Sequence, residues 1–292
     1  MTVTHSILLK AAAELMQSGA TPTVDAIIAS NPQGSTQSWA GVMHKLLAQR
    51  SALQAGTIDR AAFSIFAKGN SKLPFFAFSS MAILDCAGYG ECGKWCYSKS
   101  AWRNPNAAGR QISNSMLLRH EAGRKLIAGQ LLKLPKDVVF RLYVDGDFDS
   151  IETLRYWMEL LKQRPDVQAY GYSKSWAEFL ALELQDYAWP SNYLLNLSSG
   201  SRHPDSMRDL MAKLPITRGE FLAVPVERHH IKSGAYKSRR ADGFKDYAAA
   251  VRKNASTKVF VCSGQCGDCL PAGRHACGDA KFRNVPIAIG VH

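Results

Sequence analysis

The chain has 292 residues, of which 46% are hydrophobic, so it can bury one large domain or a main domain with an appendage. This composition excludes wholesale disorder. No apolar run reaches membrane-spanning length, and the N-terminus lacks a basic region followed by an apolar stretch. We therefore expect a soluble cytoplasmic protein with no membrane contact. The net charge of +12 indicates a polyanionic partner, most simply nucleic acid, with DNA favoured.

Three short helices are predicted within residues 6–50. The first ends at Gly19, and Thr21-Pro22-Thr23 opens the second. The third runs from Ser38 to Arg50 and carries Lys45 and Arg50 near its end. Helix, short turn, helix, Gly-Ser turn and helix is the order of a helix-turn-helix module. The alternative is a helical cap on the main domain.

This segment resembles the N-terminal DNA-binding module of the plasmid KfrA-like regulators. The resemblance rests on Ala11-Ala12-Ala13-Glu14-Leu15, Gly19, Thr21-Pro22-Thr23-Val24, Ile27 and the Gly34-Ser35 turn. It implies that the third helix faces DNA. The chain is accordingly divided into a DNA-binding module, residues 1–55, and an α/β domain, residues 56–292.

From about residue 56 strands and helices alternate. Strands are predicted at 74–84, 138–144, 167–172, 193–197, 220–224 and 258–261, with helices near 114–132, 151–164, 179–184 and 207–214. Such alternation predicts a parallel sheet, either open or closed as a partial (β/α) barrel. In both arrangements the functional site lies at the carboxyl ends of the strands.

The cysteines fall into two clusters, each directly after a predicted strand. One has the spacing C-x5-C-x3-C and the other C-x3-C-x2-C-x7-C. In a reducing compartment such clusters are metal ligands rather than disulfides. Three thiolates leave one iron of a 4Fe-4S cluster open, whereas four close a site that suits zinc or iron–sulfur. Spacing does not decide between one site and two, and unligated thiols are the alternative. The clusters are Cys86, Cys92 and Cys96, then Cys262, Cys266, Cys269 and Cys277.

Three carboxylates, Asp145, Asp147 and Asp149, follow the strand at 138–144 as D-x-D-x-D. Such a loop could hold the divalent cation of a phosphoryl-transfer site. The alternative is structural: Asp149 caps the next helix, and one aspartate pairs with Lys174.

Basic side chains gather between residues 227 and 258, with Tyr236, Phe244 and Tyr247 interleaved. Cations that contact phosphates and aromatic rings that stack on bases are typical of nucleic-acid binding. A solvated surface loop is the alternative. His229, His230 and His275 lack a convincing metal-ligand spacing. The nucleic-acid-binding candidates are Arg228, Lys232, Lys237, Arg239 and Arg240, together with Lys45 and Arg50.

The order of these parts resembles the radical SAM barrels. A first strand leads to clustered cysteines, and a second ends in Asp145-Gly146-Asp147, where that superfamily has a turn that contacts the substrate amino group. The resemblance implies an iron–sulfur cluster on the first cysteine set, with Tyr97 and Asp145 beside the cofactor. It also implies that Asp147 and Lys174 lie in the substrate or cofactor pocket. Because C-x5-C-x3-C departs from the superfamily's C-x3-C-x2-C, S-adenosylmethionine is in doubt.

Residues 65–277 resemble more closely the phage gene-product eighty-eight-like family. The shared features are Cys96-Tyr97, Gly146-Asp147-Phe148, Tyr172-Ser173-Lys174-Ser175 and the C-terminal cysteines. This resemblance implies a mobile-element origin, from a plasmid or phage. Three functions follow as hypotheses. The first is an iron–sulfur protein that works on nucleic acid as a diverged radical SAM-like enzyme. The others are a non-catalytic DNA-binding regulator with structural metal sites and a metal-dependent nuclease that uses the aspartate loop.

Overall fold

The computed structural model describes residues 4–17, 24, 27–28, 38–69, 73–232 and 238–291, apart from the side chains of Lys232 and Ala272. Within these residues seven strands form one parallel sheet in the order β1-β2-β3-β4-β5-β7-β6, which confirms the predicted α/β class and parallel pairing. The strands are β1 (Phe76–Ala77), β2 (Val139–Leu142), β3 (Gln168–Ser173), β4 (Tyr193–Ser198), β5 (Thr217–Pro225), β6 (Phe260–Val261) and β7 (Ile287–Val291).

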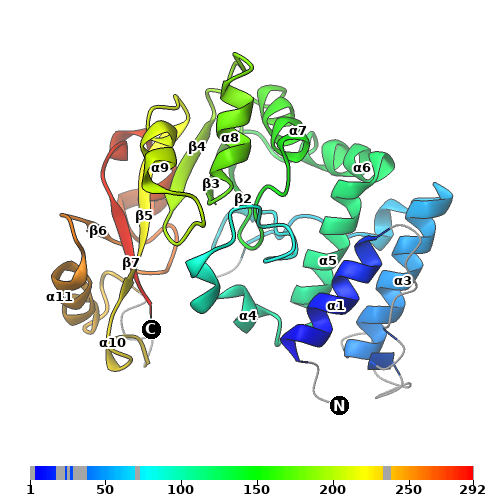
Figure 1. The fold of residues 1–292 in the computed structure, drawn as a ribbon, viewed down its shortest axis with the longest axis horizontal. Helices are drawn as coiled ribbons and strands as arrows, with labels where there is room; N and C mark the ends of the chain where they lie inside the picture. The colour runs from blue at the N-terminus through cyan, green and yellow to red at the C-terminus, as the bar shows by residue number, and fades with distance from the viewer. Residues whose placement is uncertain are drawn as a thin grey trace.

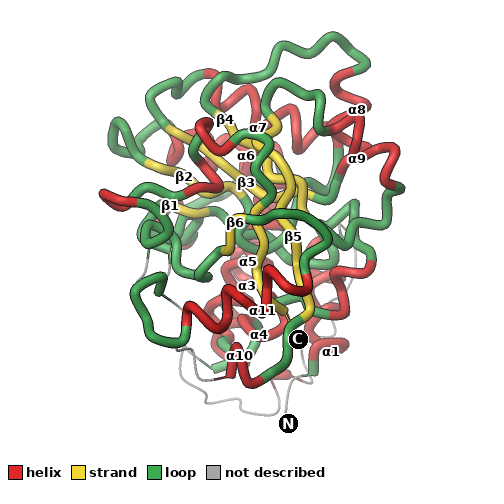
Figure 2. Tube along the Cα trace, turned by 90° about the vertical axis from the view of Figure 1, so that its left-hand side faces the viewer, coloured by secondary structure: helices red, strands yellow, loops and turns green. Residues whose placement is uncertain are grey.

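Helices cover one face of the sheet and both of its ends. Figure 1 shows α7, α8 and α9 side by side along one face, with α1, α3 and α5 gathered at one end and α10 and α11 at the other. In Figure 2 the strands lie in the middle of the molecule, with α10 and α11 on the near side. The helices are α1 (His5–Met16), α3 (Trp39–Ala55), α4 (Ser98–Ala101), α5 (Pro105–Arg119), α6 (Glu121–Leu131), α7 (Ile151–Lys162), α8 (Trp176–Glu183), α9 (Asp205–Met211), α10 (His229–Lys232) and α11 (Phe244–Asn254).

The first strand is much shorter than the predicted 74–84. Only Phe76–Ala77 pair regularly with β2, although the Ser80 amide still donates to the Asp145 carbonyl at 3.0 Å. Ile83 then takes a φ of +74° and Tyr143 a φ of +57°, conformations that a ladder cannot accommodate. The apolar run therefore ends in a turn that leads directly into the cysteines.

Two other elements differ from the sequence-based expectation. The helix predicted near 114–132 is a pair, α5 and α6, because His120 between them has an extended backbone. Strand β7 was not predicted, since its five residues are a short apolar run without a flanking helix signal. It inserts between β5 and β6, so two strands that are close in sequence are separated in the sheet.

The amphipathic helix α7 shows why the covered face is well packed. Ser150 caps it by accepting a hydrogen bond from the Thr153 amide at 3.2 Å, so Ser150 and not Asp149 is the cap. Its Trp157 is fully buried and lies edge-on against Phe78, with ring centroids 4.7 Å apart. The helix thus holds the end of the aspartate loop against the segment that follows β1.

The N-terminal helices share the core of the main domain. Leu8 and Leu15 of α1 and Met43 of α3 are buried in the same hydrophobic cluster as Ile112 and Met116 of α5. Helix α3 is longer than the predicted 38–50 and stops at Gly56, which takes the left-handed conformation. The predicted second helix of the helix-turn-helix falls largely outside the described residues. None of the helices in the described part of the chain is long and apolar enough to cross a membrane.

Candidate functional site

The first cysteine loop lies across the carboxyl ends of β3 and β4, as predicted from its position after a strand. The Cys92 amide donates to the Gly200 carbonyl at 3.0 Å, and the Arg202 amide donates to the Gly88 carbonyl at 3.2 Å. Gly88 permits this approach, because a Cβ there would lie 1.7 Å from the Lys174 carbonyl oxygen. The absence of a side chain at Gly88 therefore lets the loop pack directly against the edge of the sheet.

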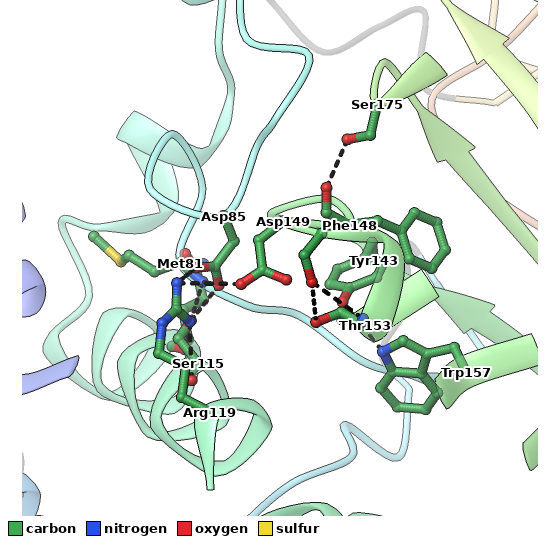
Figure 3. A network of polar contacts seen from close by, with 12 residues as sticks. Met81, Asp85, Ser115, Arg119, Tyr143, Phe148, Asp149, Thr153, Trp157 and Ser175 are labelled. Carbon is green, nitrogen blue, oxygen red and sulfur yellow. Dashed lines mark hydrogen bonds and ion pairs between the residues drawn. The ribbon is translucent and has the colours of Figure 1, made fainter. Parts of the chain in front are cut away.

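A buried ion pair holds the base of this loop. Asp85, immediately before Cys86, is 1% exposed and accepts a hydrogen bond from Arg119 of α5 at 2.8 Å. The same guanidinium reaches Asp149 of the aspartate loop at 3.3 Å, as Figure 3 shows. Burial raises the pKa of Asp85, while the Arg119 charge and the Ser115 hydroxyl oppose that rise. Arg119 thus ties the cysteine loop to the aspartate loop.

The three aspartates of the loop have separate partners. Asp145 accepts the Ser98 hydroxyl at 2.7 Å and the Ser79 hydroxyl at 3.2 Å. Asp147 is 4% exposed, and Asp149 bonds Arg119. Within the described ranges no three His, Cys, Asp or Glu side chains converge closely enough to hold a metal ion. The carboxylates therefore anchor different loops in this conformation.

Asp147 holds the end of β3 rather than the Lys174 ammonium. Its carboxylate accepts hydrogen bonds from the Ser173 hydroxyl and the Lys174 amide, each at 2.7 Å, and from the Phe148 amide at 2.9 Å. The Lys174 ammonium instead donates to the Ser198 hydroxyl of β4 at 2.8 Å. The predicted pairing of an aspartate with Lys174 is therefore made through the lysine backbone.

The thiols of the first cysteine set lie near charged groups at this edge. Cys86 accepts from the Ile83 amide at 3.3 Å, and burial raises its pKa well above the ordinary thiol value; Asp147 adds to that rise and Lys174 opposes it. Cys86 and Cys96 both lie within electrostatic reach of the Tyr97 hydroxyl, as do Asp145 and Arg141. Tyr97 remains 57% exposed. The site therefore keeps an accessible aromatic side chain beside two cysteines.

The second cysteine set covers the sheet face opposite α7, α8 and α9. Asn196 of β4 donates to the Cys277 carbonyl at 2.9 Å, and the Tyr170 hydroxyl of β3 donates to the Cys266 sulfur at 3.8 Å. Cys262, Cys266, Cys269 and Cys277 lie within electrostatic reach of one another. Burial raises the pKa of Cys277 to about 12, while the Tyr172 hydroxyl and Arg218 oppose the rise. Tertiary structure thus brings these four thiols into one region, although no three of them converge closely enough in this conformation to hold a metal ion.

Two arginines beside the cysteines were missed by sequence reasoning. Arg218 is fully buried, and its hydrogen bonds go to neutral oxygens, those of Asn196 (2.8 Å) and of the Glu220 (2.8 Å), Phe282 (3.3 Å) and Val285 carbonyls. Arg141 stacks over the Tyr172 ring at 4.7 Å, and its buried Nε finds no hydrogen-bond partner among the described residues. Its charge reaches Cys266, and that of Arg218 reaches Cys277. A cation inside a β-branched, aromatic strand was the available signal for Arg141.

Some of the nucleic-acid candidates are exposed and others have structural contacts. Arg228, Arg240 and Lys45 are exposed. Arg239 packs over the Phe260 ring at 4.5 Å and donates to the Val261 carbonyl at 3.3 Å, while Arg50 donates to the Gln17 carbonyl at 2.8 Å. Lys237 and the Lys232 side chain lie outside the described residues.

The interleaved aromatic residues do not form a stacking surface. Phe244 is 7% exposed and Tyr247 is fully buried, because both face the strands from α11. The prediction that these rings stack on bases is therefore wrong, and Tyr236 lies outside the described residues. Exposed cations remain on and around α11, at Lys245, Arg252, Lys253 and Lys258.

Comparison with known proteins gives one result. A family model described as Gene product 88 matches residues 45–285, more than half of the chain. The match begins inside α3, so it crosses the predicted boundary at residue 55. No curated protein and no solved structure matches.

Gly88→Ala tests whether the loop depends on its contact with the sheet edge. The added methyl group must displace the Lys174 carbonyl, so we expect a loss of about 1–3 kcal/mol of unfolding free energy. The control is Gly129→Ala in α6, where an added Cβ meets nothing within 4 Å and should stabilise the helix by up to about 1 kcal/mol. Denaturant unfolding measures both, and equal stabilities for the two variants would contradict the contact.

Asp147→Asn tests the anchoring role of that carboxylate. An amide cannot accept all three donors, so we expect a loss of about 1–3 kcal/mol. Burial raises the folded-state pKa of Asp147 above 3.8. The stability that this carboxyl contributes is therefore complete below pH 3.8 and is lost as pH rises through its folded-state pKa.

The destabilisation by Asp147→Asn should accordingly be larger near about pH 4 than near about pH 7. Thermal melts at the two pH values measure it. The control is the exposed Asp246→Asn in α11, which we expect to change stability by less than about 0.5 kcal/mol. A melt of Asp147→Asn that matches this control at both pH values would show that the carboxylate does not hold the loop.

Proposed function

We infer that this chain, which belongs to the gene product 88 family, is a metal-binding, nucleic-acid-associated protein of a mobile element. The first cysteine set would hold a 4Fe-4S cluster at the carboxyl edge of the sheet. The second set would hold an iron–sulfur cluster or zinc on the sheet face opposite α7, α8 and α9. The first set is Cys86, Cys92 and Cys96; the second is Cys262, Cys266, Cys269 and Cys277.

The observation that carries the metal proposal is the charge around the second set. Arg218 is buried among neutral acceptors, and Arg141 keeps an unpartnered Nε. Buried cations without an anionic partner are costly, by several kcal/mol each. Four thiolates on a zinc ion or on an iron–sulfur cluster leave about two negative charges, which two arginines would offset. With four protonated thiols, only Asp145, within electrostatic reach of Arg141, and Glu220, within electrostatic reach of Arg218, would offset these cations among the described residues.

The first set has a different environment, which supports a different role. The Cys86 thiol lies within electrostatic reach of Lys174, and the neighbouring Tyr97 is exposed. An iron–sulfur cluster with three protein ligands supplies an iron that is open to a further ligand. The thiols do not yet converge at bonding distance, so binding would draw the loop together. In this proposal Lys174, Asp145 and Tyr97 orient a cofactor or substrate, and Asp147 positions the Lys174 segment.

The resemblance to the radical SAM barrels suggests a finer fold and an enzymatic role. A cysteine loop after β1 and an acidic glycine loop after β2 meet at one edge, as in a radical SAM-like partial barrel. We propose that the chain has this partial-barrel fold and acts as an enzyme. S-adenosylmethionine remains in doubt because of the cysteine spacing. A nuclease site on the aspartate loop is disfavoured, because the three aspartates hold separate partners.

A DNA-binding regulator with structural metal sites is the second candidate, favoured by the N-terminal helices and the exposed cations. For both candidates the nucleic-acid contacts would come from α11 and its neighbours and from Lys45 of α3. Metal analysis separates them, since a structural role is compatible with zinc alone.

Metal content tests the proposal directly. Anaerobically purified protein should be brown and hold about four irons and four sulfides on the first cysteine set. Replacing Cys86, Cys92 and Cys96 together by Ser should remove this iron and leave the metal of the second set. Replacing the four C-terminal cysteines should do the reverse, so each variant is the control for the other. Colourless, metal-free wild-type protein would refute the proposal.

Salt dependence tests the nucleic-acid contacts. We expect wild-type affinity for duplex DNA to fall with salt, and Arg240→Gln with Lys253→Gln to lower the slope of log K against log salt by about one to two. Both side chains are exposed. Lys125→Gln on α6, an exposed cation paired with Glu121, is the matched control. An unchanged slope in the double variant would mean that the basic run is a solvated surface.

A further inference from the structure

A groove between α3 and α5 forms a cavity that lies apart from both cysteine sets and includes Lys45, one of the proposed nucleic-acid contacts. Its volume is about 310 Å³, at the lower end of small-molecule sites. Helix α3 and helix α5 approach closely at one point, where a Cβ on Gly109 would lie 2.6 Å from a Val42 methyl group. The groove is lined by Val42, Lys45, Leu46, Gln49, Ser64, Asn106, Gly109, Arg110 and Ser113.

Buried polar atoms in this lining lack partners. Gln49 is 4% exposed and Ser113 is 5% exposed. Among the residues that the structure describes, the Gln49 Oε1, the Ser113 hydroxyl and the Arg110 Nε find no hydrogen-bond partner, although the Gln49 amide nitrogen donates to the Ala62 carbonyl at 2.7 Å. Leaving such groups unpaired costs about 1–3 kcal/mol each, so their occurrence in one groove favours an occupant that supplies hydrogen-bond partners.

The charge of the lining selects the class of ligand. Among the described residues of the lining, Lys45 and Arg110 are charged and none is a carboxylate. Two cations, a hydroxyl and an amide oxygen match a doubly charged oxyanion. The amide oxygen would accept a hydrogen bond from a proton on that oxyanion or from a hydroxyl on the group esterified to it. The guanidinium donates to phosphate oxygens in a planar fork, and the ammonium adds a point charge.

We propose that the α3–α5 groove binds a phosphate group. Arg110 and Lys45 hold its oxygens, and Ser113 donates its hydroxyl. The Gln49 Oε1 accepts a hydrogen bond from the ligand. The inference needs neither cysteine set. A phosphorylated small molecule and the phosphorylated end of a nucleic-acid strand share this chemistry.

Calorimetric titration of the full chain with sodium phosphate tests the proposal, with sodium chloride at equal ionic strength as the reference. We expect one phosphate per chain. Arg110→Gln should weaken binding at least about tenfold, since it removes a charge-assisted hydrogen bond. Lys45→Gln, at an exposed position that folding does not require, should weaken it by about threefold or more. Lys125→Gln on α6 is the matched control and should bind as the wild type does.

Competition distinguishes the sources of the phosphate. Displacement by ribose 5-phosphate assigns the groove to small molecules, and displacement by a 5′-phosphorylated oligonucleotide but not its 5′-hydroxyl form assigns it to strand ends. If phosphate binds and neither competitor displaces it, the groove is assigned to the free phosphate ion. An equal signal from chloride would overturn the proposal. So would wild-type affinity in both Arg110→Gln and Lys45→Gln.

Discussion

The carboxyl edge of the sheet depends on buried aspartates that hold backbone and hydroxyl donors. Asp85 holds the turn before the first cysteine, Asp145 reaches the segment that follows the last cysteine of that loop, and Asp147 holds the end of β3. Burial raises the pKa of each of these carboxyls. Their donors compensate the cost of that burial, because each hydrogen bond stabilises the carboxylate. Three loops from different strands are thereby fixed relative to one another.

Arg119 extends this arrangement across the fold. Its guanidinium joins Asp85 and Asp149, and it lies at the end of α5, the helix against which α1 and α3 pack. The N-terminal helices are therefore connected to the cysteine loop through one helix and one ion pair. The α3–α5 groove is lined by this helix as well, so the proposed phosphate would brace the contact of α3 with the main domain.

The sheet face opposite α7, α8 and α9 carries arginines, whereas the carboxyl edge carries buried aspartates. Arg141 and Arg218 project from β2 and β5 toward the cysteine-bearing segment, and neutral tyrosines lie between them. His275 lies there too, and burial lowers its pKa to about 4, so it adds no charge near neutral pH. In the described part of the chain the two arginines form no ion pair with a carboxylate, although Asp145 and Glu220 lie within electrostatic reach, and they lie next to the four thiols, so this face suits an anionic metal–thiolate centre.

The sequence by itself determined the class of the fold, the parallel pairing and the edge at which the cysteine and aspartate loops meet. These follow from periodicity and from the rule that strand ends of a parallel sheet share an edge, and the family match agrees with the resemblance seen in Cys96-Tyr97 and Gly146-Asp147-Phe148. Only the tertiary structure decided that Arg119 bridges two loops, that Tyr247 is core and that Asn196 and Arg218 meet. It also placed β7 between β5 and β6. These are contacts between residues far apart in the chain, which local patterns do not encode.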